Sequence, residues 1–280
     1  ESALHESADS LPEDFVALCT LVHRASGIKI DGNKRALVDA RLRHRLVELG
    51  LPNLGTYLEF VGGDASGREL EILLDLISTN VTSFFRERHH FEHLAREVLA
   101  NHLKPGLTGP LRIWSAACSS GEEPYSIALS LANALGPTQL NRFLILASDL
   151  SSRMVDRAAA GIFPSEALSP VPAHWRATWF KAVGTEDRQV VPRLRERVRA
   201  RRLNLLAPWP MQRSFSAIFC RNALIYFDEP TRQRLVERFW DQLAPGGYLY
   251  IGHSESLSML NHRFEYAGPT IYRRPQGASA

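Results

Sequence analysis

The stretch from Leu111 to Leu131, LRIWSAACSSGEEPYSIALSL, constrains the fold of this chain more than any other. It opens with a short apolar run, continues with small residues and two glutamates, and leads through Pro124 into an apolar pattern with helical spacing. Proline suits the first turn of a helix, where its missing N–H is not needed. The pattern therefore predicts a strand, a tight turn and a helix, and the small residues let a ligand approach the backbone closely.

The two glutamates in this turn narrow the class of ligand. In doubly wound sheets, nucleotide-like ligands bind at the carboxyl ends of the strands, but Glu122 and Glu123 would repel a phosphate. They favour a ligand with hydroxyl groups or a positive charge, and S-adenosylmethionine has both and no phosphate. Phosphate-binding glycine motifs and the G-x-S-x-G nucleophile elbow are absent. We expect Glu122 to contact the ligand and Glu123 to interact with the positive end of the helix dipole.

The rest of residues 111–274 alternates between strand and helix patterns, which predicts an α/β domain with a mostly parallel sheet. Residues 143–147 are continuously apolar, as in a strand buried on both faces. The further elements expected are a helix from 152, a strand at 215–220, a helix at 229–243, a strand at 248–252 and a closing hairpin within 264–273.

Residues 12–79 are predicted to form a small all-α domain. Its helices are expected at 12–25, 33–49, 54–61 and 67–78, from their apolar spacing. Residues 80–110 then form a joint and a connecting helix at 89–103, whose histidines (His89, His90, His93) we expect to be solvated. Residues 1–11 are expected to be a disordered lead-in, and 104–110 a loop.

A basic stripe lies on the predicted helix 33–49. Lys34, Arg41 and Arg45 share one side of that helix. One interpretation is a solvated edge, and the other is a docking face for an acidic surface.

The segment 162–202 interrupts the strand–helix alternation. Pro164–Trp179 suggests short helices and turns, and five arginines then recur at every second residue from Arg193 to Arg201. A period of two is typical of a strand, so we expect a small antiparallel β insertion with one positive face. That face would bind a carboxylate- or phosphate-bearing partner, or would only keep an edge strand soluble.

Four positions should converge at one edge of a doubly wound sheet. They are the turn at 117–122, Asp149 after the second strand, Arg221-Asn222 after a later strand, and Asn204-Leu205 after the insertion. An acid at the place of Asp149 can hold both ribose hydroxyls. Its alternative role is that of an acid at a helix N-terminus.

Composition and cysteine usage exclude several protein classes. With 45% hydrophobic and 22% charged residues, the chain is typical of a soluble globular protein. No apolar run approaches the length of a membrane span, and no secretory signal is visible. Three widely spaced cysteines suit a reducing cytoplasm. We expect no metal site, because no Cys/His cluster has zinc-ligand spacing.

Five sequence segments together carry a resemblance to a known family. They are Thr79–Glu87 (TNVTSFFRE), Trp114–Ser126 (WSAACSSGEEPYS), Ala147–Asp149 (ASD), Ile218–Phe227 (IFCRNALIYF) and Gly252–Ser256 (GHSES). These segments resemble the bacterial chemotaxis receptor methyltransferases, the CheR family, over nearly the whole chain. The resemblance implies an all-α N-terminal domain and a Rossmann-like S-adenosylmethionine-dependent methyltransferase domain with an inserted β subdomain.

The same resemblance implies which residues form the site. Cofactor contacts are implied for Asn80, Thr82, Arg86, Glu122, Asp149, Asn204, Leu205, Arg221 and Asn222. Arg86 and Tyr226 are the implied catalytic pair near the transferred methyl group. Two positions depart from the family pattern: Cys118 stands where some members have alanine, and Ser216 stands where an acid is common. We expect Ser216 to lie at the start of its strand, away from the site.

The implied reaction is methyl transfer from S-adenosylmethionine to glutamate side chains on cytoplasmic helices of chemoreceptors, for chemotactic adaptation. The products are glutamate methyl esters and S-adenosylhomocysteine. A glutamate has a pKa of about 4.3, so it is already an anionic nucleophile and needs no general base. Positioning can be worth ~7–11 kcal/mol. Arg86 could hold a carboxylate through two hydrogen bonds, and Tyr226 could donate one.

Two other functional classes are weighed against receptor methylation. A nucleic-acid methyltransferase agrees with the pI of about 8.9, but the Asn/Asp-Pro-Pro-aromatic loop and the Pro-Cys nucleophile are absent: the chain has Arg221-Asn222-Ala223-Leu224, and Phe219 precedes Cys220. A binding-only adaptor is opposed by the retained Arg86, Asn222 and Tyr226. We expect a cytoplasmic monomer without nucleic-acid partners or direct membrane insertion. In the family that this chain resembles, the β subdomain of some members binds a receptor C-terminal peptide, and that of others does not.

Overall fold

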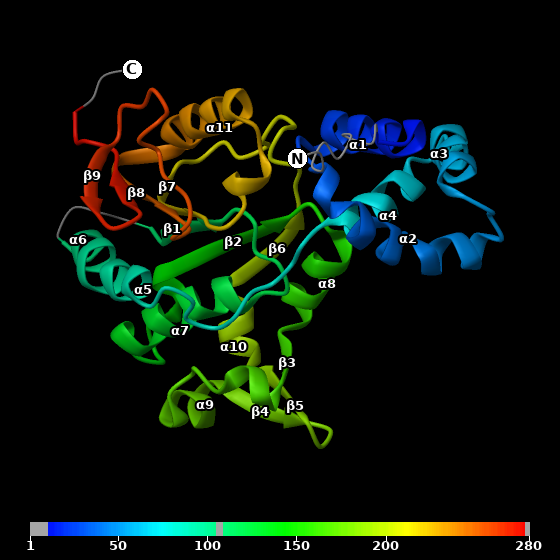
Figure 1. The fold of residues 1–280 in the computed structure, drawn as a ribbon. Helices are drawn as coiled ribbons and strands as arrows, with labels where there is room; N and C mark the ends of the chain where they lie inside the picture. The colour runs from blue at the N-terminus through cyan, green and yellow to red at the C-terminus, as the bar shows by residue number, and fades with distance from the viewer. Residues whose placement is uncertain (1–10, 105–108, 278–280) are drawn as a thin grey trace, which may run out of the picture. The chain divides into compact units, whose positions relative to one another are not determined.

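The computed structural model describes residues 11–104 and 109–277. The expected disordered lead-in therefore lies outside the described residues, except for Leu11, and so do four residues of the expected loop at 104–110. The chain divides into two compact units, the first ending at Ser78 and the second beginning at Thr79. Figure 1 labels most of the helices and strands of both units.

The first unit is helical, as predicted from its apolar spacing. It contains α1 Glu13–Ser26, α2 Arg35–Leu49, α3 Leu54–Gly63 and α4 Arg68–Ile77, with the 3₁₀ turn η1 Gly32–Lys34 before α2. Helix α1 packs against α3, and α2 packs against α4. Leu18 and Val22 of α1 and Leu42 of α2 are almost fully buried in this core. The four predicted helices are confirmed.

The basic stripe on α2 is neither a solvated edge nor a free docking face at Arg41 and Arg45. Arg41 Nη1 donates to the carbonyl oxygen of Ile77 at 2.7 Å, where the end of α4 leaves carbonyl groups without helical partners. Arg45 pairs with the buried Glu69, with Nη2 to Oε2 at 2.5 Å, and this hydrogen bond lowers the pKa of Glu69. Both arginines therefore hold α2 against α4.

The second unit is built on a seven-stranded sheet in the order β6–β2–β1–β7–β8–β10–β9 (Figure 1). The strands are β1 Leu111–Ser115, β2 Phe143–Asp149, β6 Val198–Arg202, β7 Phe215–Cys220, β8 Leu243–Ile251, β9 Glu265–Gly268 and β10 Ile271–Arg273. The first five in this spatial order pair in parallel, and β10 pairs antiparallel with β8 and β9. The predicted α/β fold is confirmed. Ser216 is the second residue of β7, as expected.

Helices cover the sheet unequally on its two faces. The helical segments that flank the large sheet include α5 His89–His93, the π-helical segment η2 Leu94–Leu99, α6 Ala100–His102, α7 Glu122–Leu135, α8 Ser152–Ala160 and α11 Glu229–Gln242, and the 3₁₀ turn η3 Leu140–Arg142 precedes β2. One apolar cluster joins α5, η2, α7 and α8 to Phe143 and Ile145 of β2. A second cluster joins α11 to Trp114 of β1 and Ile218 of β7. The sheet thus separates two cores.

Two of the three histidines expected to be solvated are buried. His90 is 0% and His93 is 8% exposed. The ring of His90 lies near Tyr250, and its Nε2 is 2.8 Å from Thr270 Oγ1. The expectation failed because α5 packs against the sheet on the side that carries these two residues. Burial lowers the pKa of His90 to about 2.

A three-stranded antiparallel sheet, in the order β3–β5–β4, follows α8. Its strands are β3 Ile162–Pro164, β4 Phe180–Val183 and β5 Asp187–Val190, and the helical turns are η4 Ser165–Leu168 and α9 Ala173–Trp179. The short helices predicted between Pro164 and Trp179 are confirmed.

The arginine-rich segment after this sheet was assigned wrongly. Pro192–Arg195 forms the one-turn helix α10, and Val198–Arg202 forms β6. Strand β6 is the parallel edge strand of the large sheet, beside β2, and does not belong to the antiparallel insertion. The period of two is real within β6, since Val198 and Ala200 are buried while Arg199 and Arg201 are exposed. A period of two in the sequence predicts a strand, but it does not predict which strand will pair with it.

Candidate functional site

The carboxyl ends of four neighbouring parallel strands bring the predicted site positions to one edge of the large sheet. In the order β6–β2–β1–β7, these strands lead to Asn204-Leu205, to Asp149, to the turn before α7 and to Arg221-Asn222. Figure 1 shows these strands adjacent to one another. Parallel strands end at the same edge, where α/β folds bind their ligands.

The turn between β1 and α7 is tight and tolerates little change. Gly121 has φ +108°, and a Cβ added there would lie 2.9 Å from Ala158 Cα. Ser119 also has positive φ, at +47°. Glu122 begins α7, is 8% exposed, and accepts a hydrogen bond from Ser120 Oγ at 2.6 Å. The turn is thus held by packing on α8 and presents a carboxylate at the start of α7.

Asp149 joins the ends of two strands. Its Oδ2 accepts from the Ser119 N–H at 2.9 Å, and its Oδ1 accepts from the Ser151 N–H at 3.0 Å. The first bond ties β2 to the β1–α7 turn, and the second lies at the start of α8, whose N-cap is Ser151. Asp149 therefore contacts both the turn and a helix N-terminus. Fixing the carboxylate in this way suits it to hold a pair of ribose hydroxyls.

The joint after Thr79 packs on the same turn. Ser119 Oγ donates to the carbonyl of Asn80 at 2.9 Å, and the Phe85 N–H donates to Ser126 Oγ of α7 at 2.9 Å. Phe85 and Glu87 have φ of +53° and +58°. Positive φ at such residues is costly and tends to cluster at functional sites. The exposed Arg86 lies between them, and its Nη1 donates to the Val81 carbonyl.

A buried ion network lies beneath this joint and was missed by sequence reasoning. Arg221 Nη1 is 3.1 Å from Glu123 Oε2, and Arg221 Nη2 is 3.4 Å from Glu87 Oε2. Arg221 Nη2 also donates to the carbonyl of Arg86, and Ser115 Oγ donates to Glu123 Oε1 at 2.6 Å. Burial raises the pKa of Glu123, although Arg221 opposes that shift.

This network changes the interpretation of Glu123 and Arg221. Glu123 does lie in the first turn of α7, but its carboxylate is committed to Arg221 rather than only to the helix dipole. The side chain of Arg221 is 3% exposed, and its guanidinium donates to the backbone carbonyl of Arg86. No local pattern distinguishes Glu122 from Glu123, because the partners of Glu123 lie on other segments of the chain.

A second carboxylate outside the predicted set fixes Asn222. Glu255, in the GHSES segment, accepts from the N–H groups of Asn222 at 2.9 Å, Ile225 at 3.2 Å and Gly252. Asn222 has φ +57°, and a Cβ on Gly252 would lie 2.4 Å from Asn222 Nδ2. The only signal of this role in the sequence is that Glu255 is the acidic residue of the GHSES segment.

The remaining predicted residues lie on the loops after β6 and β7 and on the joint. Asn204 Oδ1 accepts from the Leu206 N–H at 2.9 Å, and the Leu205 carbonyl accepts from Arg238. Tyr226 ends the 3₁₀ turn η5 Leu224–Tyr226 and is half-buried, as is Thr82. The binding and catalytic roles of all these residues stay predictions.

The hydrogen bonds of the turn between β1 and α7 favour a ligand without phosphate. A phosphate site at a strand–helix turn uses free backbone N–H groups. Here the N–H groups of Cys118, Ser119 and Gly121 donate to Ser148, Asp149 and Cys118. The turn and the end of β2 supply carboxylates instead, from Glu122 and Asp149. This arrangement fits the hydroxyls and positive charge of S-adenosylmethionine.

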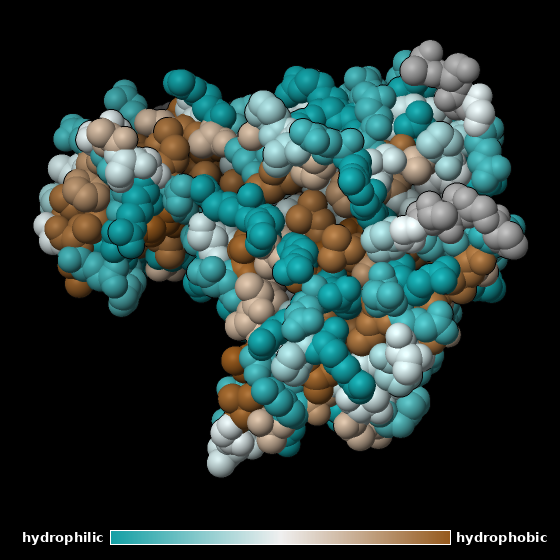
Figure 2. Space-filling model, turned by 180° about the vertical axis from the view of Figure 1, so that it is seen from behind, coloured by the Kyte–Doolittle hydropathy of each residue, from teal (hydrophilic) through white to brown (hydrophobic). Residues whose placement is uncertain are grey.

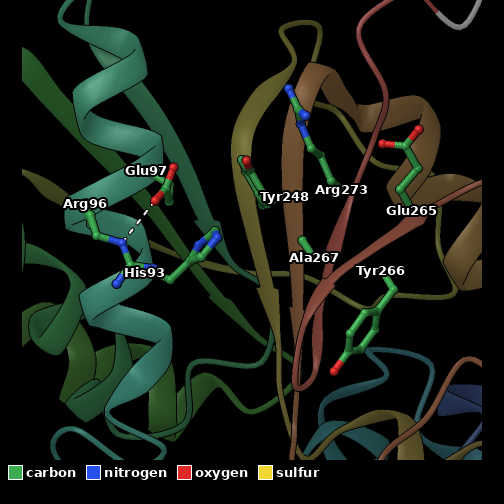
Figure 3. A pocket seen from close by; sticks show the side chains of 8 residues that line it. All are labelled: His93, Arg96, Glu97, Tyr248, Glu265, Tyr266, Ala267 and Arg273. Carbon is green, nitrogen blue, oxygen red and sulfur yellow. Dashed lines mark hydrogen bonds and ion pairs between the residues drawn. The ribbon is translucent and has the colours of Figure 1, made fainter.

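A separate cavity of about 300 Å³ lies between helix α5–η2 and strands β8, β9 and β10 (Figure 3). It is lined by His93, Arg96, Glu97, Tyr248, Glu265, Tyr266, Ala267 and Arg273. None of these is a predicted site residue. Among residues 11–104 and 109–277, no group of three or more His, Cys, Asp or Glu could hold a metal ion.

Comparisons with known proteins match most of this chain, in both of its units. A family model described as "CheR methyltransferase, all-alpha domain" matches residues 13–78, and one described as "CheR methyltransferase, SAM binding domain" matches residues 80–273. A "Probable chemotaxis protein methyltransferase" of Rhizobium etli is 40% identical over 90% of this chain and 96% of that protein. A "Chemotaxis protein methyltransferase" of Klebsiella aerogenes is 38% identical over 97% and 93%. One of Escherichia coli is 38% identical over 92% and 89%.

Proposed function

This chain belongs to the CheR family of S-adenosylmethionine-dependent methyltransferases, and we propose that it methylates glutamate side chains of bacterial chemoreceptors. The products would be glutamate methyl esters and S-adenosylhomocysteine, and the role would be chemotactic adaptation. The observation that carries this proposal is the match of both domains to one family. Relatives named as chemotaxis methyltransferases support the same activity.

We propose that different residues of the site contact different parts of S-adenosylmethionine. Asp149 would hold the ribose hydroxyls, with its carboxylate oriented by Ser119 and Ser151. Glu122 would face the positively charged part of the cofactor. Asn204, Leu205, Asn222, Asn80 and Thr82 would line its adenine and methionine portions. Bound S-adenosylmethionine supplies a methyl group on a positively charged sulfur.

The residues of this chain have to position the nucleophile rather than activate it. The target glutamate is ionised near neutral pH, since its pKa is about 4.3. Holding it in line with the methyl group and excluding water can contribute ~7–11 kcal/mol. We propose that Arg86 binds a carboxylate of the cofactor or of the substrate, and that Tyr226 donates a hydrogen bond to one of them.

In this proposal Arg221 does more than contact the cofactor directly. Its buried guanidinium donates to the carbonyl of Arg86, so it fixes the backbone from which the Arg86 side chain extends. The positive φ values on both sides of Arg86 need such support, because each costs conformational energy. Arg221 would therefore act as a positioning residue for Arg86.

The substrate would be the cytoplasmic helices of a chemoreceptor, and we therefore expect this protein to work in the cytoplasm as a monomer. In the described part of the chain, no helix is both long and apolar enough to cross a bilayer. A receptor C-terminal peptide could bind the small antiparallel sheet, whose outer strands are β3 and β4. The exposed turn Gly184–Glu186 between β4 and β5 lies at this sheet.

The decisive experiment is transfer of a labelled methyl group to receptor cytoplasmic fragments, with double-stranded DNA as the rival substrate. We expect label on the receptor that mild base releases as methanol, because glutamate methyl esters hydrolyse in base. A receptor fragment with its methylation-site glutamates changed to alanine is the matched control. Base-stable label on DNA, with none on the receptor, would replace this proposal by the nucleic-acid alternative.

Peptide docking can be tested separately by calorimetry with receptor C-terminal peptides. We expect binding to weaken when the sheet edge is blocked by the substitution Ile162→Pro, since proline removes a backbone donor from an edge strand. Equal binding by the variant would exclude this edge, while the methyl-transfer assay would remain the test of the activity itself.

A further inference from the structure

An apolar cavity of about 230 Å³ opens at the amino ends of the strands, at the opposite end of the sheet from the candidate site. Its apolar lining includes Leu144 and Leu146 of β2, Phe215 at the start of β7 and Met211 in the preceding loop. In the view of Figure 2, hydrophobic residues reach the surface as separate patches among hydrophilic ones. This cavity is a defined depression lined by such residues.

The cavity exists because one face of β2 lacks a covering helix. Parallel sheets usually have helices over both faces. On the face that α11 covers, the connection between β6 and β7 over residues 203–214 contains no helix or strand. Its Trp209 packs on Trp114 of β1, with ring centroids 4.7 Å apart, but Leu144 and Leu146 of the next strand stay only half-buried.

Three arginines surround this apolar floor, and no acidic residue lines the cavity. They are Arg112 of β1, Arg199 of β6 and Arg213 before β7. Within the described ranges of the chain, none of their guanidinium groups has an ion-pair or hydrogen-bond partner. An occupant must therefore combine an apolar group with negative charge. The cavity in Figure 3 differs, because its arginines are accompanied by Glu97 and Glu265.

The size of the cavity decides between kinds of occupant. Small-molecule sites usually have ~300–1,000 Å³, so this cavity is small for one. It suits a single large apolar side chain from a protein partner, and such anchors carry much of the energy of protein interfaces. We propose that this surface binds an acidic protein segment that inserts one apolar side chain between Arg112, Arg199 and Arg213.

The position of the surface sets how such a partner would act. The amino ends of β1, β2 and β7 lie a full strand length away from the carboxyl ends that hold Asp149 and Arg221. A partner bound here would leave the candidate site accessible. The surface therefore suits recruitment of the enzyme rather than blocking of the reaction, and its existence does not depend on the proposed substrate.

The test uses labelled pentapeptides with the full chain, read by fluorescence anisotropy. The probes are Glu-Glu-Phe-Glu-Glu, its alanine-centred form and Lys-Lys-Phe-Lys-Lys. We expect only the first to bind, and its affinity to fall at least tenfold in the double variant Arg199→Glu/Arg213→Glu. That variant should instead bind the lysine peptide, because its charge is reversed. Arg176→Glu, an exposed arginine on α9, is the control and should bind the acidic peptide normally.

Several results would overturn the proposal. Absence of saturable binding by the acidic peptide below a Kd of about 1 mM, equal binding of the alanine-centred peptide, or failure of the charge reversal would each do so. Sedimentation of the free protein tests a second copy as the occupant. Dimers that disappear in the double variant would show that this face joins two copies instead of binding an acidic partner.

Discussion

Glu122 and Glu123 are adjacent in the chain, yet their carboxylates have different partners in the structure. The substitution Glu123→Ala tests whether Glu123 mainly stabilises the fold. The Glu123 carboxylate is 3.1 Å from Arg221 and accepts from Ser115 at 2.6 Å. Removing it leaves the buried guanidinium with Glu87 as its one remaining carboxylate partner, beside the carbonyl of Arg86, and leaves a buried hydroxyl without its acceptor. Breaking one side of a buried ion pair costs ~3–5 kcal/mol. Because Glu87 still faces Arg221, we expect a loss near the lower bound, about 3 kcal/mol.

Urea unfolding followed by tryptophan fluorescence measures this loss. All five tryptophans lie in the second unit, so the signal reports on the unit that contains the network. The expected result is a lower midpoint with an unchanged slope, which indicates lost stability without a change in exposed surface. Glu122→Ala is the matched control. Its carboxylate accepts from Ser120, and losing that bond should cost only about 1 kcal/mol.

Substitutions at the two positions should have the opposite order of effect on the binding of S-adenosylmethionine. Glu122→Ala should weaken S-adenosylmethionine binding in calorimetry while the protein stays folded. Glu123→Gln should keep the shape of the site and lose stability without a comparable loss of affinity. Equal stability losses for Glu122→Ala and Glu123→Ala, or a loss below about 1 kcal/mol for the latter, would refute the ion-network reasoning.

Four further outcomes follow from particular contacts. Arg86→Ala and Tyr226→Phe should retain the urea midpoint and lower labelled-methyl transfer, and normal affinity with normal turnover would remove either residue from the mechanism. The free energy of unfolding should fall as the pH drops below 6.5, by up to about 1.4 kcal/mol per pH unit. The reason is that His90 takes up a proton in the unfolded chain but not when it is buried in the folded protein. His90→Phe should flatten this slope in urea titrations at several pH values. Arg45→Ala should destabilise the first unit by about 3 kcal/mol, seen by circular dichroism, since the Glu69 carboxylate loses its ion-pair partner and keeps only the hydrogen bond from Tyr57. An unchanged midpoint would contradict this. Gly252→Ala should weaken S-adenosylmethionine binding in calorimetry by displacing Asn222, and wild-type affinity would show that the loop absorbs the added carbon.

Local patterns predicted most elements because they depend on neighbouring residues alone. The run Phe215–Cys220 was predicted as a strand and is β7 with the same bounds. The Pro124 signal likewise marked the first turn of α7. Apolar spacing and proline geometry act over one or two turns of the chain, so the sequence is sufficient to reveal them.

The errors concern residues whose partners are distant in sequence. Arg41 contacts residues 35 to 37 positions away, and Arg221 contacts Glu123 at a separation of 98. A helical wheel shows that charges share a side but not what packs there. The same limitation applied to His90, which faces Thr270, and to β6, whose alternation could not name its neighbouring strand.

The sequence by itself determined the strand–turn–helix at Leu111–Leu131, the helical first domain, and the acids that favour an unphosphorylated ligand. Only the tertiary structure decided how the carboxylates in that turn divide their roles. Glu122 lies beside Ser120 at the candidate site, while Glu123 is turned into a buried network with Arg221 and Glu87. The physical reason is that burying a charge is unfavourable unless a partner reaches it, and packing of the joint and β7 on α7 brings that partner.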